Sequence, residues 1–275
     1  MRILMALMCA LWLSLPCQAR PSEARAAAER LVAAYPQAGM RLVEEGGALF
    51  VELDGRKLLF SPPGGCPDVP SGGLLADPRD PPLCAMLAQP YPVGEGARHP
   101  AEGFNPGRVR SDGFFTLLYG KDAGSVAGHC RTVGFAGEAL QFNGRHGAAE
   151  ALGRVAADVE RLLARDPALA QWVHPLAGSF FWRRIKNSPR LSMHSFGIAI
   201  DLNPDKGVYW LWKPPAQALE RVRVAYPQAL VDAFEAEGFI WGGKWDAFDF
   251  MHYEYRPELF PPKADVSSGE NAPRD

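Results

Sequence analysis

The stretch of sequence that decides the fold is Ser192–Asp201, which reads SMHSFGIAID. Its last four residues alternate between apolar and small or acidic types, which predicts a strand with its two isoleucines toward the core. Asp201 then lies on the opposite face, beside a small alanine that leaves room for something to approach. Gly197 permits a sharp entry to this strand, so the preceding His194 can fold back toward Asp201.

A second stretch, Trp245–Glu254, reads WDAFDFMHYE and carries similar chemistry. His252 and Glu254 lie two residues apart, a spacing that places both on one face of a strand. Asp249 lies three residues before His252, and residues three apart point to opposite faces of a flat strand. We therefore expect Asp249 on a turn that leads into the strand, if both residues are to reach one target.

Two histidines and an aspartate suit a zinc ion, and three protein ligands with an open fourth position are typical of a catalytic zinc. His194, Asp201 and His252 are the candidates for such a site. Asp249 is the candidate general base, which takes a proton from activated water and later returns it. Spacing alone leaves an ordinary interpretation open, in which the histidines are surface or core residues and Asp201 is a helix cap or an ion-pair partner.

A resemblance to a known family favours the zinc site. Ser192–Asp201 resembles the S-x-H-x-x-G-x-A-x-D signature of zinc peptidases that include vancomycin-resistance-type D-alanyl-D-alanine carboxypeptidases, D-alanyl-D-alanine dipeptidases and phage-lysin L-alanyl-D-glutamate endopeptidases. Asp249 and His252 resemble the second motif, an acidic residue, two positions and the last histidine ligand. The resemblance covers about residues 147–260, and residues 104–120 look like the upstream part of one secreted subgroup.

The resemblance implies a role for each site residue. His194, Asp201 and His252 hold Zn²⁺, and Asp249 acts as general base and then as acid. This chain departs from the carboxypeptidase and dipeptidase branches, which place glutamate at the position of Asp249. Because aspartate is one methylene shorter than glutamate, the backbone must come closer to the water. This departure leaves open which bond of the substrate is cleaved.

The segment before the first motif resembles the corresponding lead-in of these enzymes and supplies Arg183, which binds substrate or the developing oxyanion. An arginine suits this role because its planar, charged fork grips a carboxylate or oxyanion. Because Arg184 is adjacent, the substrate-binding arginine of the family corresponds to either Arg183 or Arg184. We also expect Ser192 and Trp245 at the substrate site. The alternative for Ser192 is that it orients the first-motif loop, and the alternative for Trp245 is that it packs at the edge of the sheet.

The first 19 residues resemble a secretory signal peptide: Arg2, an apolar run of about 13 residues and a small Ala19. This run is too short for a membrane span, which needs roughly 20 residues. A transmembrane anchor and a lipoprotein cut before Cys17 are the weaker alternatives. We therefore expect a secreted or periplasmic protein with no stable membrane insertion after signal cleavage.

Three cysteines follow the signal, and export places them in an oxidising compartment where disulfides persist. Cys66 and Cys84 bracket a loop rich in proline, glycine and aspartate that has little core of its own. We favour a disulfide between these two, with Cys130 left over, although three cysteines allow two other pairings.

The composition sets outer limits on the protein. The chain has 275 residues, 47% of them hydrophobic, which excludes a disordered or fibrous protein. The balance of 29 basic and 31 acidic residues argues against a nucleic-acid binder with a broad basic surface.

We predict an α+β fold with a small antiparallel sheet that carries the zinc site, flanked by helices, and an N-terminal helix and hairpin extension. The expected division is a signal peptide (1–19), an N-terminal extension (20–135), a catalytic domain (136–262) and a disordered tail (263–275). The expected elements are helices over 22–34, 114–119 and 147–165, hairpins over 41–60, a strand pair over 132–142 and a helical region over 215–237 interrupted at Pro227.

The sequence thus predicts a secreted, monomeric zinc peptidase that hydrolyses an amide bond in peptidoglycan stem peptides, of the carboxypeptidase or endopeptidase type. Two alternatives stay open: an inactive zinc-containing module that binds the cell wall, and a zinc hydrolase of another substrate class. All predicted ligands and the base are present, which favours the enzyme over the module.

Overall fold

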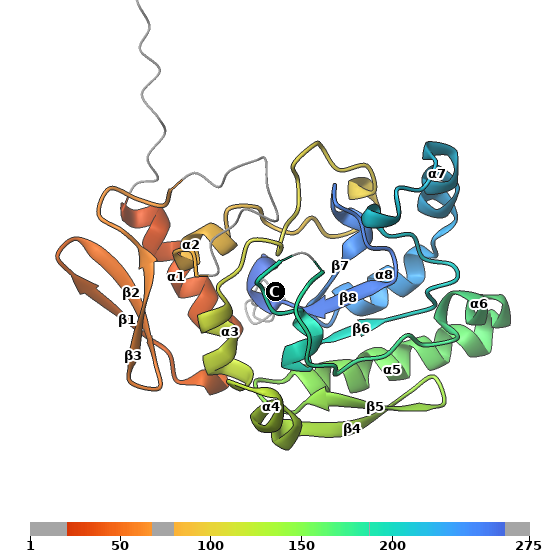
Figure 1. The fold of residues 1–275 in the computed structure, drawn as a ribbon, viewed down its shortest axis with the longest axis horizontal. Coiled ribbons are helices and arrows are strands. Elements are labelled where there is room, and N and C mark those ends of the chain that lie inside the picture. The colour runs from red at the N-terminus through yellow and green to blue at the C-terminus, as the bar shows by residue number, and fades with distance from the viewer. Residues whose placement is uncertain (1–20, 68–79, 187, 262–275) are drawn as a thin grey trace, which may run out of the picture.

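The computed structural model describes residues 21–67, 80–186 and 188–261. The predicted α+β class is confirmed: helices surround three small antiparallel sheets (Figure 1). The helices of the described residues are α1 Pro21–Ala34, α2 Leu83–Met86, α3 Asp112–Tyr119, α4 Ala123–His129, α5 Ala148–Arg165, α6 Ala170–Val173, α7 Ala216–Ala225 and α8 Gln228–Glu235. The strands are β1 Arg41–Glu45, β2 Ala48–Leu53, β3 Arg56–Ser61, β4 Cys130–Phe135, β5 Glu138–Asn143, β6 Ala199–Asp201, β7 Phe239–Trp241 and β8 His252–Tyr255.

The sheet formed by β6, β8 and β7 positions the polar residues of the two motifs. Strand β8 lies in the middle and pairs antiparallel with both neighbours. Its register places Asp201 opposite His252 and Ala199 opposite Glu254. Because directly opposite residues share a face of the sheet, these polar side chains gather on one side.

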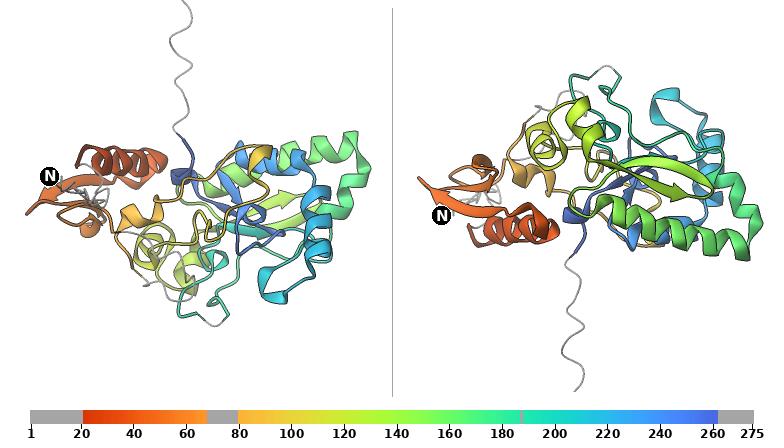
Figure 2. Two further views of the ribbon diagram at one scale, coloured as in Figure 1. Left: turned by 90° about the horizontal axis from the view of Figure 1, so that it is seen from above. Right: turned by 90° about the horizontal axis from the view of Figure 1, so that it is seen from below.

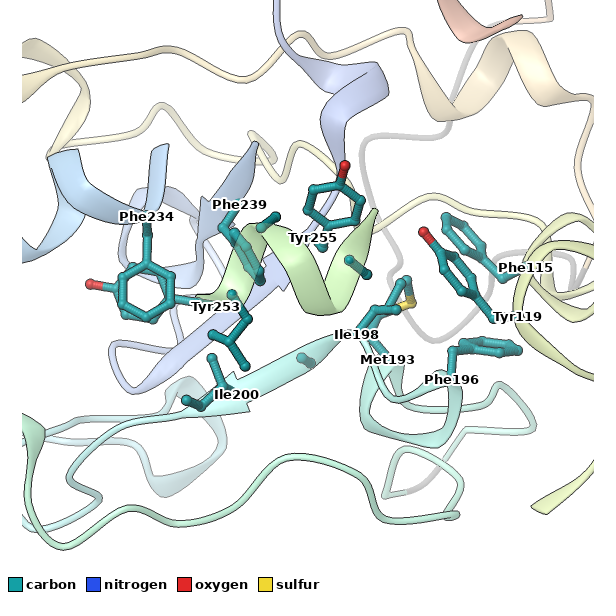
Figure 3. Packing of buried hydrophobic residues seen from close by; sticks show 14 of the residues in the cluster. Phe115, Tyr119, Met193, Phe196, Ile198, Ile200, Phe234, Phe239, Tyr253 and Tyr255 are labelled. Atoms are coloured by element: carbon teal, nitrogen blue, oxygen red, sulfur yellow. The ribbon is translucent and has the colours of Figure 1, made fainter. Parts of the chain in front are cut away.

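The opposite face of this sheet is packed with apolar side chains, several of which Figure 3 shows. Ile198, Ile200 and Tyr253 are fully buried. The Tyr253 ring stacks on Phe234 of α8 with centroids 3.9 Å apart. Burial of such side chains is worth about 1.5–3 kcal/mol each, so this packing fixes which face carries the polar residues.

The N-terminal part consists of α1 and the three-stranded sheet β1-β2-β3, which lie together at one end of the molecule (Figure 2). The dipeptides Gly46-Gly47 and Asp54-Gly55 form its two turns, and all four residues have positive φ, as hairpin turns of this type require. Buried residues of α1 and β2 belong to the same hydrophobic cluster as the β6-β8-β7 sheet.

The helix α4 was not anticipated from the sequence. Its segment AGSVAGH contains two glycines, which disfavour a helix. A reciprocal capping box compensates: the Asp122 carboxylate accepts from the Ser125 N–H, and the Ser125 hydroxyl accepts from the Asp122 N–H.

Residues 87–111 are largely irregular, as expected, and side chains from α8 and the following loop hold them in place. Buried Glu235 accepts from the Tyr91 hydroxyl and from the Gly94 N–H. Buried Lys244 donates to the carbonyls of Pro92 and Gly94 and pairs with Glu235 at 2.5 Å. A disulfide joins Cys66 and Cys84, the favoured pair, and Cys130 is a free thiol.

The predicted signal peptide and the tail after residue 262 lie outside the described residues. The expected boundary between residues 135 and 136 falls at the turn of the β4-β5 hairpin. Within the described ranges, no helix combines the length and apolar character that crossing a membrane requires.

Candidate metal centre

Three segments bring His194, Asp201 and His252 together. His194 lies on the short 3₁₀-helix Met193–Phe196, which ends at Gly197 in the left-handed conformation (φ 68°). This turn folds the helix back against the strand β6, whose last residue is Asp201. His252 opens β8, directly opposite Asp201 in the register.

The ligand atoms of these three residues all lie within 4.8 Å of one another. Asp201 Oδ1 is 2.9 Å from His252 Nδ1, and Asp201 Oδ2 is 3.1 Å from His194 Nε2. The two imidazole rings are 5.1 Å apart between centroids. Each histidine therefore turns one nitrogen toward a common point that the aspartate also faces.

The other nitrogen of each ring is held in place, which is the usual arrangement of metal-binding histidines. His194 Nδ1 lies 2.6 Å from the Ser179 carbonyl oxygen, and His252 Nε2 lies 2.9 Å from Glu254 Oε2. His194 Nε2 is buried and makes no hydrogen bond despite its proximity to Asp201. A buried nitrogen with no partner is costly, and a metal ion would satisfy it, so these residues fit a zinc ion.

The charges of the cluster are mutually dependent. Burial raises the pKa of Asp201, but the two histidines outweigh it and hold that pKa well below its usual range. Burial lowers the pKa of His252, whereas hydrogen bonds with Asp201 and Glu254 raise it to about 10. The acidic surroundings that stabilise a proton here are equally suited to a divalent cation.

Glu254 is the residue of this site to which sequence reasoning gave no role, although its spacing of two from His252 already placed both on one face. Its second oxygen accepts from Arg256 Nη1 at 2.9 Å. Arg256 Nε in turn donates to Glu258 at 2.5 Å, and the Tyr35 hydroxyl donates to the other oxygen of Glu258 at 2.5 Å. This buried ion chain, His252-Glu254-Arg256-Glu258-Tyr35, runs from the ligand cluster to the residue after α1.

Asp249 lies on the turn before β8, where its carbonyl accepts from the His252 N–H at 3.2 Å. Its carboxyl oxygen Oδ1 is buried and has no hydrogen-bond partner. Burial raises the pKa of Asp249 to about 6, against the opposing effect of His252. A carboxyl group with a pKa near neutrality can both accept and donate a proton at physiological pH.

The segment that carries these donors and the carboxyl group also matches a known family in sequence. Residues 186–255 match the D-alanyl-D-alanine carboxypeptidase family. The family resemblance inferred from the motifs is thereby confirmed for a segment that contains all three donors and Asp249. No solved structure matches the chain significantly.

Two glycines within the carboxypeptidase-family segment position Asp249. A Cβ on Gly242 would lie 2.4 Å from the Asp249 carbonyl oxygen, and one on Gly243 would lie 2.2 Å from the Trp241 ring. The Asp249 N–H donates to the Gly242 carbonyl at 2.9 Å. The pair is thus a closely packed 3₁₀ turn against which the Asp249 backbone rests.

Arg183 lies just before the carboxypeptidase-family segment and is exposed. Its backbone is fixed by Ser195, whose hydroxyl accepts from the Arg183 N–H and donates to the Arg183 carbonyl. The Arg184 guanidinium folds back onto the Pro189 carbonyl, whereas the Arg183 guanidinium makes no hydrogen bond or ion pair with a described residue. Of the two neighbouring arginines, Arg183 is the one with a guanidinium available to a ligand.

Ser192 and Trp245 are both buried. Ser192 precedes the 3₁₀-helix of His194, and its N–H donates to the Arg183 carbonyl at 3.0 Å. Trp245 was expected at the substrate site, but it is 1% exposed and donates to the Pro106 carbonyl at 2.7 Å. Its ring lies 5.7 Å from that of His252, so it supports the ligand cluster from within.

Proposed function

We propose that this protein is a secreted zinc peptidase that hydrolyses an amide bond in the peptide stems of peptidoglycan. The observation that carries the proposal is the meeting of His194, Asp201 and His252 at one point, with the buried carboxyl group of Asp249 on the adjoining turn. The match of this segment to a carboxypeptidase family supports a peptidase.

In the proposed reaction, His194 Nε2, His252 Nδ1 and an oxygen of Asp201 would hold a zinc ion. When bound there, the ion would supply Lewis-acid chemistry, which polarises a carbonyl group and lowers the pKa of water toward neutrality. Asp249 takes the proton from the attacking water and passes it to the leaving amine. Arg183, whose guanidinium makes no hydrogen bond or ion pair with a described residue, binds the developing oxyanion or a substrate carboxylate.

Location outside the cytoplasm is part of the proposal. The Cys66–Cys84 disulfide is consistent with an oxidising compartment. The signal-like first 19 residues and the accessibility of peptidoglycan to an exported enzyme point the same way. We also propose that residues 136–262 carry the chemistry and that residues 20–135 support it.

The decisive test replaces Asp249 with asparagine, which keeps the side-chain volume but cannot accept the proton. We expect Asp249→Asn to bind zinc as the wild type does and to lose at least 100-fold in activity, the lower range for general acid–base catalysis. Zinc content by metal analysis and digestion of purified peptidoglycan followed by mass spectrometry of the products provide the measurements.

Asp205→Asn is the matched control, because Asp205 is exposed and its carboxylate makes no contact with the ligand cluster. It should cleave as the wild type does. Retained activity in Asp249→Asn would exclude Asp249 as the base. A zinc-loaded wild type that releases no fragments from peptidoglycan would instead favour the binding module, and cleavage of an ester or phosphoester alone would favour another hydrolase class.

A further inference from the structure

Tyr209 is a polar side chain beside Asp249 to which neither the motifs nor the proposed reaction gives a role. It lies in the segment between the two motifs, directly before the short 3₁₀-helix Trp210–Trp212. The backbone of this segment pairs with the turn before β8, where Tyr209 and Asp249 form an isolated antiparallel bridge. Two residues that are distant in the sequence are thereby held opposite each other.

The hydrogen bonds around this bridge show which way the two side chains leave the backbone. The residue after Tyr209 donates its N–H to the Phe248 carbonyl, and the residue before it accepts from the Phe250 N–H, both at 3.0 Å. Tyr209 and Asp249 are therefore a non-hydrogen-bonded antiparallel pair, in which the Cα atoms lie about 4.5 Å apart and the side chains are close. Directly opposite residues share a face, so the phenol lies on the same side as the Asp249 carboxyl group.

Neighbouring aromatic rings hold the phenol in place. The half-buried Tyr209 ring meets the Trp210 ring at 6.3 Å between centroids and the Trp212 ring at 5.9 Å, both in edge-to-face contact. Such contacts are favourable at these separations. They restrict the orientation of the ring, as a group that must meet a reacting atom requires.

The charges that act on the phenol belong to the reaction centre. Burial raises the pKa of Tyr209; among the neighbouring charges, Arg108 and Arg183 lower that pKa and Asp249 raises it. The phenol thus interacts electrostatically with both the candidate base and the candidate substrate-binding arginine, which come from different segments. Because its pKa lies above the ordinary value, the phenol is neutral at physiological pH and carries a proton that it can donate.

That proton has no acceptor among the described residues. A hydrogen bond with Trp210 also lowers the pKa of Tyr209, and an indole nitrogen can only donate, so the phenol oxygen is the acceptor in it. The Tyr209 O–H itself donates to no described residue. Asp249 Oδ1 has no hydrogen-bond partner either, so the two groups do not satisfy each other. The O–H is therefore available to a group from outside the protein.

We infer that Tyr209 is a catalytic residue of the proposed peptidase, whose hydroxyl donates a hydrogen bond to the oxyanion that forms on the scissile carbonyl. The inference rests on the proposed function and adds a neutral donor to the groups already named. A donor that is in position before the reaction stabilises the oxyanion more than it stabilises the ground-state carbonyl, and therefore raises kcat.

The proton balance of the reaction is unchanged by this donor. As water attacks the carbonyl carbon, an electron pair of the C=O bond moves to the oxygen, and Asp249 takes the proton of the water. The oxyanion then re-forms the C=O bond, the C–N bond breaks, and Asp249 passes the proton to the nitrogen. Tyr209 keeps its own proton throughout.

Tyr209→Phe removes only the hydroxyl and keeps the ring, so it is the direct test in the full-length, zinc-loaded protein. Loss of one oxyanion donor typically lowers kcat about 100- to 1000-fold. We expect a loss of that size, with little change in KM, on a synthetic stem peptide that ends in D-alanyl-D-alanine and on purified peptidoglycan. Zinc content and the urea midpoint of unfolding should equal those of the wild type.

Tyr255→Phe is the matched control and should cleave as the wild type does. Tyr255 is buried, and its hydroxyl makes no hydrogen bond with a described residue. Its ring packs in the hydrophobic cluster on the apolar side of β8, away from His252 (Figure 3).

A tetrahedral analogue separates stabilisation of the oxyanion from other causes of a low kcat. The probe is a stem peptide in which a phosphinate group replaces the amide bond that the wild type cleaves. Its affinity, measured by calorimetry, should fall in Tyr209→Phe by the same factor as kcat/KM and should be unchanged in Tyr255→Phe.

Two results would overturn the inference: a kcat of Tyr209→Phe equal to that of the wild type, or a reduced kcat with unaltered affinity for the phosphinate peptide. Either result leaves the proposed peptidase intact. By contrast, a wild type that carries zinc and cleaves neither the stem peptide nor peptidoglycan contradicts the proposed function itself.

Discussion

Two charged regions flank the β6-β8-β7 sheet, and they solve the problem of buried charge in opposite ways. In the buried ion chain, every carboxylate meets a cation or a hydroxyl: Glu254 and Glu258 both bind Arg256. In the pocket lined by Arg108, Arg110, Lys186 and Arg190, the hydrogen bonds of Arg108 and Arg110 go to carbonyl oxygens, while Asp249 and Glu254 act on these two arginines through longer-range electrostatics. The difference teaches that the first region pairs its charges in direct contact, whereas Arg108 and Arg110 in the second do not.

The largest effect should follow from breaking the ion chain at its centre. Arg256→Met leaves Glu254 and Glu258 buried without their cation, and removal of one partner from a buried ion pair costs about 3–5 kcal/mol. The free energy of unfolding, measured with urea, should fall by that amount. Arg154→Met breaks the surface pair with Glu237, where Arg154 is 59% exposed, and should cost at most about 1 kcal/mol. Equal losses in the two variants would refute the distinction.

A smaller effect should follow from changing the link between the ion chain and the metal ligand. Glu254→Gln keeps the shape of the side chain but weakens its hold on His252 Nε2. Loss of such a partner typically lowers metal affinity about 10- to 100-fold. Competition with a chelator measures the zinc dissociation constant, and the exposed Glu160→Gln should leave it unchanged. Unaltered affinity in Glu254→Gln would mean that Glu254 does not orient the ligand.

The smallest expected effect concerns Lys186, which lies in the second charged region and not in the ion chain. Because the exposed Lys186 forms no hydrogen bond or ion pair with a described residue, Lys186→Gln should change the free energy of unfolding by no more than about 0.5 kcal/mol. The same urea titration used for Arg256→Met provides the comparison. A loss of 2 kcal/mol or more would show that Lys186 stabilises the fold, and it would contradict the contrast with the ion chain.

Much of the site was predictable because its determinants are local in sequence. The spacing of His194 and Asp201 around Gly197, and of Asp249 and His252 before a strand, allowed these side chains to converge, and the resemblance to the peptidase motifs favoured that interpretation over the ordinary one. Periodicity likewise predicted α5, and paired turn residues predicted the N-terminal hairpins. These features follow from short-range rules of helix, strand and turn geometry.

What could not be predicted depends on contacts between distant segments. Trp245 was expected beside the substrate, but its indole N–H finds a carbonyl at Pro106 and the ring is buried. The role of Glu254 depends on Arg256 and Glu258. These three residues alternate along the end of β8 and the segment that follows it, and this pattern matches no recognised motif. The pocket joins residues near 108 and near 188, which no local pattern relates.

The buried ion chain has a consequence for how the protein can be shortened. Glu258 depends on the Tyr35 hydroxyl, and Arg256 also donates to the Gly107 carbonyl at 2.8 Å. A fragment limited to residues 136–262 contains every proposed zinc ligand, yet it lacks both of these partners. Residues 21–67 and 80–135 therefore brace, through Tyr35 and Gly107, the end of the segment that carries the proposed zinc ligands.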